Sequence, residues 1–139
     1  MSELHRYGAR SIAKLSTCHV DLERVMEHAL DLCPFDIIIV CGIRTKEAQE
    51  EAFSKGLSKK HWPNSKHNSL DGKSRAVDIA PWINGTINWK DEGSFYMLAG
   101  VVHAAAAVQG VQIRFGGDWD RDGLTEDQTF MDIGHFELV

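Results

Sequence analysis

Two histidines and two aspartates are the residues of this chain best suited to act together in chemistry. His67 lies in a long polar stretch, Asp78 ends the run Ala76-Val77-Asp78, and Asp132 and His135 lie near the C-terminus. Two imidazoles and one carboxylate can hold a zinc ion and leave its fourth position open for water. A further carboxylate nearby can take a proton from that water. These residue types indicate metal-assisted hydrolysis.

Simpler explanations exist for some of these residues. Asp78 lies among apolar residues, where an unpaired charge is costly, so we expect it to have a partner. A buried salt bridge explains Asp78 as well as a metal does, and it is His135, near a second short strand, that favours the metal. Asp71 is a rival ligand, but Leu70-Asp71-Gly72 is typical of an exposed turn. His61, in the polar stretch, is a candidate substrate contact.

A second cluster of carboxylates stands apart from the first. Asp118, Asp120 and Asp122 occupy alternate positions and are followed by Gly123, a residue type that suits a tight turn. This spacing matches the first half of an EF-hand calcium loop. Clustered carboxylates repel one another without a cation, which favours calcium, and the alternative is a solvated acidic turn.

The remainder of that loop matches the calcium pattern in part. The carbonyl of Leu124 and a carboxylate of Glu126 or Asp127 are the further candidate ligands. The twelfth position is Thr129, where an EF-hand has a glutamate that binds through both oxygens. We therefore expect an incomplete calcium loop a short way before Asp132.

Three helices are expected to support these residues. Apolar residues recur at helical spacing over Val20–Leu32. Thr45 can cap a second helix that runs to about Lys55, and a third covers Asp91–Gln109 with a glycine directly after it. Ser11–Lys14 matches the Ser-x-x-Lys motif of penicillin-binding enzymes, but no companion motif follows, so a helix face explains it better.

Short apolar segments alternate with these helices. The Asn-Gly pair within Trp82–Ile87 predicts a hairpin turn, and the polar stretch Leu57–Arg75 predicts a long loop of the kind that is often functional. The expected strands of one small sheet are Ile37–Cys41, Ala76–Ala80, Val111–Phe115 and His135–Leu138.

The expected fold is therefore of the α+β class, a small antiparallel sheet packed with about three helices and with the zinc site at the sheet. The chain has 139 residues, 43% of them apolar, so we expect residues 1–139 to form a single catalytic domain. Its formal net charge of -5 argues against a general nucleic-acid binder. No apolar run reaches transmembrane length and the N-terminus lacks a signal-peptide hydrophobic region, so we expect synthesis in a cytoplasm and no membrane insertion.

The cysteines do not point to a metal centre. Cys18, Cys33 and Cys41 form no Cys-x-x-Cys pair. We expect reduced, partly buried thiols, with a zinc–thiolate site as the lesser alternative.

Taken together, the motifs resemble a known family of zinc metallopeptidases, the D-alanyl-D-alanine carboxypeptidases of VanY type. The similarity is closer to the phage L-alanyl-D-glutamate endopeptidases, a group of endolysins. The segments that carry this resemblance follow one another in order over nearly the whole chain. They are Gly42–Thr45, Ser65-x-His67, Ala76–Pro81, Arg114–Trp119 and Asp132-x-x-His135-Phe136-Glu137-Leu138.

One spacing departs from the family pattern Ser-x-His-x-x-Gly-x-Ala-x-Asp. His67 and Asp78 are eleven residues apart, which is further than in that pattern. The extra residues fall within Asn68–Ser74, as in a loop insertion.

The resemblance implies a role for each matching residue. His67, Asp78 and His135 would bind Zn²⁺, and Asp132 would be the catalytic carboxylate that activates the zinc-bound water. Arg44 matches a family arginine near the site, where a guanidinium suits a peptide carboxylate or a developing oxyanion. A structural ion pair is the competing explanation for Arg44.

Two further residues match the family pattern beside the ligands. Ser65 would orient the loop or a ligand by hydrogen bonding, and Glu137 would support a metal ligand or be an exposed strand residue. Some related endolysins are controlled by calcium, so the resemblance also supports regulatory Ca²⁺.

The implied function is hydrolysis of peptidoglycan stem peptides, at the L-alanyl-D-glutamate bond, during phage-encoded lysis of the host. D-alanyl-D-alanine carboxypeptidase activity is the enzymatic alternative. A noncatalytic, metal-stabilised wall-binding module is the alternative of another class, and the presence of Asp132 favours an enzyme. We expect a monomer that is made in the host cytoplasm and reaches the wall through a separate membrane pore.

Overall fold

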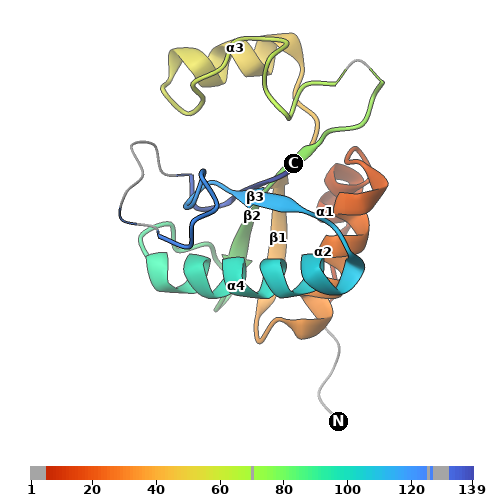
Figure 1. The fold of residues 1–139 in the computed structure, drawn as a ribbon, viewed down its shortest axis with the longest axis vertical. Helices are drawn as coiled ribbons and strands as arrows, with labels where there is room; N and C mark the ends of the chain where they lie inside the picture. The colour runs from red at the N-terminus through yellow and green to blue at the C-terminus, as the bar shows by residue number, and fades with distance from the viewer. Residues whose placement is uncertain (1–5, 70, 125, 127–131) are drawn as a thin grey trace.

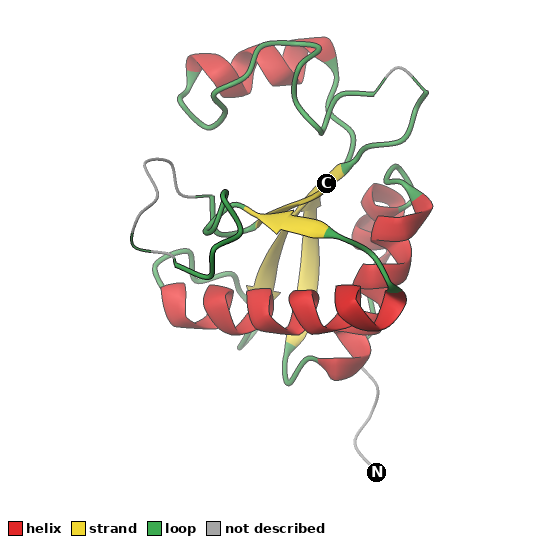
Figure 2. Cartoon of the chain, in the orientation of Figure 1, coloured by secondary structure: helices red, strands yellow, loops and turns green. Residues whose placement is uncertain are grey.

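A four-stranded antiparallel sheet organises the chain, and its strands run in the order β1-β2-β4-β3. The computed structural model describes residues 6–69, 71–124, 126 and 132–139. Figures 1 and 2 show the sheet at the centre of the molecule, with one long helix lying across it. The strands are β1 Asp36–Cys41, β2 Ala76–Trp82, β3 Ile113–Phe115 and β4 His135–Leu138. The predicted α+β class with a small antiparallel sheet is confirmed.

Among the described residues, four helices accompany the sheet. Helix α2 spans Val20–Leu32, as predicted. Helix α3 covers Lys46–Ser54, and the hydroxyl of Thr45 caps it. Helix α4 covers Glu92–Gln109. Helix α1, Ala9–Leu15, is additional to the three expected helices and contains the segment with the Ser-x-x-Lys match.

Two predicted turns, the one at the end of α4 and the one at Asn84-Gly85, are confirmed. Gly110 ends α4 in the left-handed conformation, with φ of 69°. Asn84 and Gly85 both have positive φ, 55° and 74°, between the bridged residues Ile83 and Thr86. Asparagine and glycine tolerate this conformation better than other residues, so both segments turn where the sequence indicated.

Helix α4 packs on one face of the sheet and α2 packs on α4, and apolar side chains of both helices and of this face form the core. Val77, Ile79 and Phe136 are at most 1% exposed. Side chains alternate between the two faces of a strand. Asp78 and His135 therefore lie on the opposite face of the sheet, away from this core.

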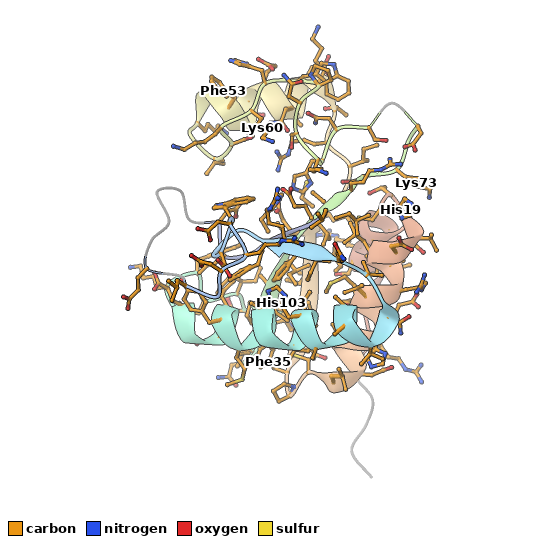
Figure 3. All side chains as sticks on the ribbon, in the orientation of Figure 1. His19, Phe35, Phe53, Lys60, Lys73 and His103 are labelled. Atoms are coloured by element: carbon orange, nitrogen blue, oxygen red, sulfur yellow. The ribbon has the colours of Figure 1, made fainter. Side chains whose placement is uncertain are left out.

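Helix α3 and the segment after it lie apart from the other helices, beyond one end of the sheet (Figure 1). The segment ends where Arg75 N donates to the Lys66 carbonyl at 2.9 Å, so the insertion after His67 closes on itself before β2. Figure 3 shows Lys73 near His19 at the edge of this region, and Lys73 Nζ donates to the Ser16 carbonyl at 2.7 Å. Within the described part of the chain, no helix is both long and apolar enough to cross a membrane.

Candidate active site

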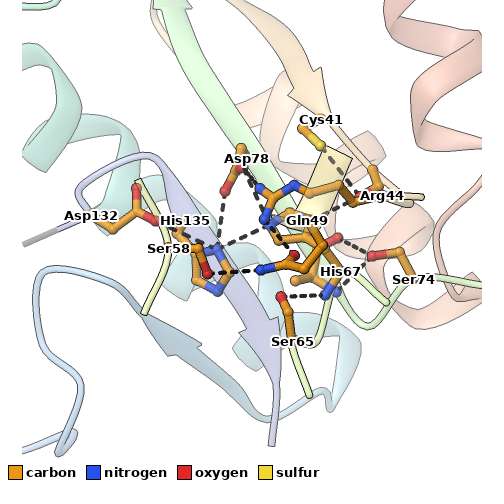
Figure 4. Close-up of polar contacts among 12 residues, drawn as sticks. Cys41, Arg44, Gln49, Ser58, Ser65, His67, Ser74, Asp78, Asp132 and His135 are labelled. Carbon is orange, nitrogen blue, oxygen red and sulfur yellow. Dashed lines mark hydrogen bonds and ion pairs between the residues drawn. The ribbon is translucent and has the colours of Figure 1, made fainter. Parts of the chain in front are cut away.

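Strand pairing and one loop bring the four predicted residues together. Asp78 on β2 lies directly opposite His135 on β4. His67 reaches them from the long segment before β2, and Asp132 lies in the turn that leads into β4. Figure 4 shows the four side chains converging on one point from these separate elements.

Three of these side chains, those of His67, Asp78 and His135, form a triangle in which the third corner is the Asp78 carboxylate, with one oxygen facing each imidazole. His67 Nε2 lies 3.2 Å from His135 Nδ1 and 3.2 Å from Asp78 Oδ2, and His135 Nδ1 lies 3.0 Å from Asp78 Oδ1. In a tetrahedral zinc site with bonds of roughly 2.0–2.1 Å, neighbouring ligand atoms stand roughly 3.3–3.4 Å apart. The donor set and its spacing therefore fit one face of a zinc tetrahedron, with the fourth position left for water.

Hydrogen bonds behind the two imidazoles set which nitrogen faces the triangle. His67 Nδ1 lies 2.7 Å from the Gly42 carbonyl, which can only accept, so this nitrogen carries the proton. His135 Nε2 lies 2.8 Å from Glu137 Oε1 and donates to that carboxylate. In its neutral form, each ring would therefore turn its lone pair towards Asp78. Backing of this kind is usual for metal-binding histidines.

The electrostatics of the triangle favour a cation. Burial lowers the pKa of His67, but the Asp78 carboxylate outweighs it and raises that pKa to about 10. Burial raises the pKa of Asp78, but His67 and His135 outweigh it and hold that pKa well below its usual range. Both shifts mean that positive charge among these side chains is stabilised, and a divalent metal ion supplies such charge.

Asp132 lies beside the triangle as a separate base. Its Oδ2 is 3.8 Å from His135 Nδ1, and its side chain is 35% exposed. Burial and the Asp78 carboxylate raise the pKa of Asp132 to about 6. The backbone holds it in place, since Asp132 N donates to the Gly116 carbonyl at 2.9 Å. A carboxylate with these properties can accept and return a proton near neutral pH.

Arg44 is tied into the same cluster. Its Nη2 lies 3.3 Å from Asp78 Oδ2, and its Nη1 donates to Gln49 Oε1 at 2.8 Å. Gln49 is fully buried, and its Nε2 donates to Ser58 Oγ at 2.9 Å and to the Lys60 carbonyl at 2.7 Å. Arg44 thus forms an ion pair with the candidate ligand Asp78. Its hydrogen bond to the buried Gln49 also holds the guanidinium beside the triangle.

Ser65 and Asn68 shape the loop that carries His67. The backbone N–H of His67 donates to Ser65 Oγ at 3.2 Å. Asn68 Oδ1 accepts from the Ser65 N–H at 3.1 Å, and Asn68 Nδ2 donates to Gln49 Oε1 at 3.3 Å. The polar side chains around His67 therefore connect its loop to α3.

Sequence reasoning missed two residues at this site. Cys41 lies directly opposite Asp78 on β1, and its Sγ is within 4.8 Å of ligand atoms of His67 and Asp78. Gln49 is the buried link between Arg44 and the long loop. The motif search for paired cysteines could not find Cys41, because its position follows from strand pairing. For Gln49, the available signal in the sequence was a polar residue at a position of a short helix that faces inward.

The rival ligand Asp71 and the candidate substrate contact His61 lie elsewhere. Asp71 is exposed and forms an ion pair with Arg75, at 2.7 Å between Asp71 Oδ1 and Arg75 Nη1. His61 Nδ1 lies 2.8 Å from Glu50 Oε2, with both side chains more than 40% exposed. Neither joins the triangle.

The second carboxylate cluster is also assembled. Oxygens of Asp118, Asp120 and Asp122 lie within 4.8 Å of one another. Asp118 Oδ2 accepts from Gly123 N at 2.8 Å, and Asp122 Oδ1 accepts from Leu124 N at 2.8 Å. Local backbone donors thus offset part of the repulsion. Glu126 is exposed, and two other positions considered for this loop, Asp127 and Thr129, lie outside the described residues.

Comparison with known proteins places this arrangement in a family. The family model for phage L-alanyl-D-glutamate peptidases matches residues 3–139. The L-alanyl-D-glutamate peptidase of Escherichia phage T5 is 36% identical over 138 residues, covering 96% of this chain and 98% of the phage protein. The crystal structure of the Serratia marcescens L-Ala D-Glu endopeptidase ChiX is similar, with a TM-score of 0.74 and 26% identity over 97% of this chain and 91% of that one. The family resemblance seen in the motifs is confirmed, and the chain belongs to the phage L-alanyl-D-glutamate peptidase family.

Proposed function

We propose that this protein is a zinc-dependent endopeptidase that hydrolyses the L-alanyl-D-glutamate bond of peptidoglycan stem peptides. The observation that carries the zinc assignment is the triangle of His67, Asp78 and His135, with edges of 3.0–3.2 Å and with Asp132 beside it. Support for the bond comes from the family and from the activities named for the phage T5 and Serratia proteins.

Each residue of the site has a separate role in the proposed hydrolysis. A zinc ion held by the triangle would act as a Lewis acid and lower the pKa of a water molecule to about 7. Asp132 would accept a proton from the water that adds to the L-alanyl carbonyl carbon, and would return it to the D-glutamate nitrogen as the peptide bond breaks. Arg44 places a fixed positive charge near the carbonyl oxygen on which negative charge develops.

The biological setting is the bacterial cell wall during phage release. The similarity to a phage protein supports a role as an endolysin in host lysis. We further propose that the protein acts as a monomer and that a separate membrane pore lets it reach the wall.

Analysis of digested peptidoglycan tests this function. Mass spectrometry of the fragments is expected to reveal new L-alanine carboxyl ends together with new D-glutamate amino ends. Release of terminal D-alanine alone would instead identify a D,D-carboxypeptidase. Zinc binding and wall binding without any new ends would identify a noncatalytic module.

We propose calcium as a regulator at the second cluster. The supporting observation is the convergence of Asp118, Asp120 and Asp122, with the Leu124 carbonyl and Glu126 as further candidate ligands. Calcium binds six to eight oxygens. A bound ion would order the segment that leads to Asp132, and activity would then rise with calcium concentration.

A further inference from the structure

The triangle and Asp132 lie between two hollows, one lined by many cationic residues and the other lined mainly by apolar residues. The first, of about 370 Å³, lies beside His67, Asp132 and His135, and the second, of about 480 Å³, lies on the side of Asp78. Both hollows share Arg44, Leu57 and Asp132 in their linings. A peptide that reacts beside Asp132 can therefore extend into both of them.

The first hollow is basic, although the protein carries a formal net charge of -5. Apart from Arg44, its lining includes four cationic residues and two carboxylates, those of Asp132 and Glu137. This concentration of positive charge opposes the sign of the whole protein and would attract an anionic group. The four cationic residues are Lys59, Lys60, Lys66 and Arg114.

Arg114 is the cation best placed to bind that anionic group. It lies opposite Glu137 in the sheet, and its Nη1 is 3.5 Å from Glu137 Oε2, a long contact. Among the described residues, Arg114 Nε is the buried side-chain polar atom that has no hydrogen-bond partner. Lys66 lies nearby and donates from Nζ to the Leu138 carbonyl at 3.1 Å. The Arg114 side chain as a whole is 36% exposed where it lines the hollow, and a guanidinium suits a carboxylate.

The second hollow is largely apolar on the far side of Asp132. Trp89 is 59% exposed and stacks on Phe95, with ring centroids 5.7 Å apart. Ile79 and Ile133 continue this lining. The apolar surface formed by Trp89, Ile79 and Ile133 suits an uncharged part of the substrate.

The chemistry of an L-alanyl-D-glutamate bond has the same asymmetry. D-glutamate has two carboxyl groups, and at most one of them continues the peptide, so the other is a free carboxylate beyond the scissile nitrogen. L-alanine on the other side carries a methyl group and no charge.

We infer that the two hollows set the direction of the substrate, with the free D-glutamate carboxylate bound by Arg114 and Lys66 and the L-alanyl side against Trp89. This inference rests on the proposed function. It makes Arg114 a residue that determines specificity for an acidic residue after the scissile bond.

A pair of synthetic substrates tests the inference. They are identical acyl-L-alanyl-D-glutamyl peptides in which the free glutamate carboxyl is either a carboxylate or a carboxamide. The wild-type kcat/KM is expected to be about ten- to a hundredfold higher for the carboxylate, the range of one charge-assisted hydrogen bond. Arg114→Gln should remove most of this ratio, and Lys66→Gln should lower it by less.

Matched variants separate the subsite from general effects. Arg24→Gln removes the same charge from the exposed surface of α2 and should keep the wild-type ratio. Trp89→Ala should lower kcat/KM for both substrates alike and leave their ratio unchanged. Because the ratio is measured within one variant, altered zinc content or stability cancels.

Each remaining outcome is decisive. An Arg114→Gln variant that keeps the wild-type ratio would overturn the subsite, as would a wild-type enzyme that cleaves both substrates equally, and in both cases the peptidase assignment stands. If Trp89→Ala changes the ratio and Arg114→Gln does not, the peptide runs in the opposite direction. A zinc-loaded wild type that cleaves neither substrate would remove the proposed function itself.

Discussion

The proposed catalytic carboxylate, Asp132, is held by a glycine on the neighbouring segment, Gly116. Asp132 N donates to the Gly116 carbonyl at 2.9 Å, and a β-carbon added at Gly116 would overlap the Asp132 carbonyl. Gly116 N in turn donates to the His135 carbonyl at 2.8 Å. One residue without a side chain therefore sets the distance between the proposed base and a proposed zinc ligand.

Gly116→Ala is expected to displace Asp132 and lower kcat by about tenfold or more, since misplacement of a catalytic group by about 1 Å costs up to roughly a hundredfold. Zinc content should fall much less than kcat. Gly100→Ala on α4 is the control, because a β-carbon there meets nothing within 4 Å and should stabilise the helix by about 0.5–1 kcal/mol. Wild-type kcat in Gly116→Ala would show that this contact does not position the base.

Asp132→Asn is expected to retain the fold and the zinc while kcat falls by about 10²–10⁴-fold, because an amide cannot accept a proton from water. Peptide hydrolysis and metal analysis on the same preparation measure both quantities. Asp71→Asn, at an exposed carboxylate that pairs with Arg75 and is not part of the triangle, should keep normal turnover. Near-normal turnover of zinc-loaded Asp132→Asn would exclude Asp132 as the base.

His135→Ala is expected to lose zinc, because the two remaining ligands cannot complete one face of a tetrahedron. Metal analysis of the purified variant measures the loss. His28→Ala, whose ring contacts Gln109 on the far side of the core, should keep the wild-type zinc content. Unchanged zinc in His135→Ala would remove His135 from the site.

Glu137→Gln is expected to weaken zinc binding by about 10–100-fold, the usual effect of altering the partner behind a metal-binding histidine. The carboxylate accepts from His135 Nε2 at 2.8 Å, and an uncharged amide is a weaker acceptor there. Competition with a chelator of known affinity measures the change. Zinc affinity equal to that of the wild type would mean that Glu137 has no part in tuning the ligand.

Asp120→Ala is expected to weaken the rise of activity with calcium while zinc content stays constant. Removing one carboxylate lowers the number of oxygen ligands and the charge that binds the ion. Calorimetry and activity across a calcium titration are the measurements, with Asp21→Ala on the surface of α2 as the control. If the wild type binds no calcium at millimolar concentration and a calcium-selective chelator leaves activity unchanged, the cluster is an acidic turn.

The sequence by itself determined the features that depend on neighbouring residues. The apolar period over about Val20–Leu32 predicted α2, and Thr45 and Gly110 predicted the start of α3 and the end of α4. These signals are local, because capping, turn conformation and helical periodicity act within a few residues. The family motifs likewise indicated the proposed ligands by their immediate sequence context.

The tertiary structure decided how those residues meet. His67 and His135 are 68 residues apart in the chain, yet their nitrogens lie 3.2 Å apart. The register of β2 with β4 puts Asp78 opposite His135, and that of β3 with β4 puts Arg114 opposite Glu137. Register follows from which faces of distant strands share the core, a cooperative property that no local pattern contains. The ligand triangle and the basic hollow both result from that register.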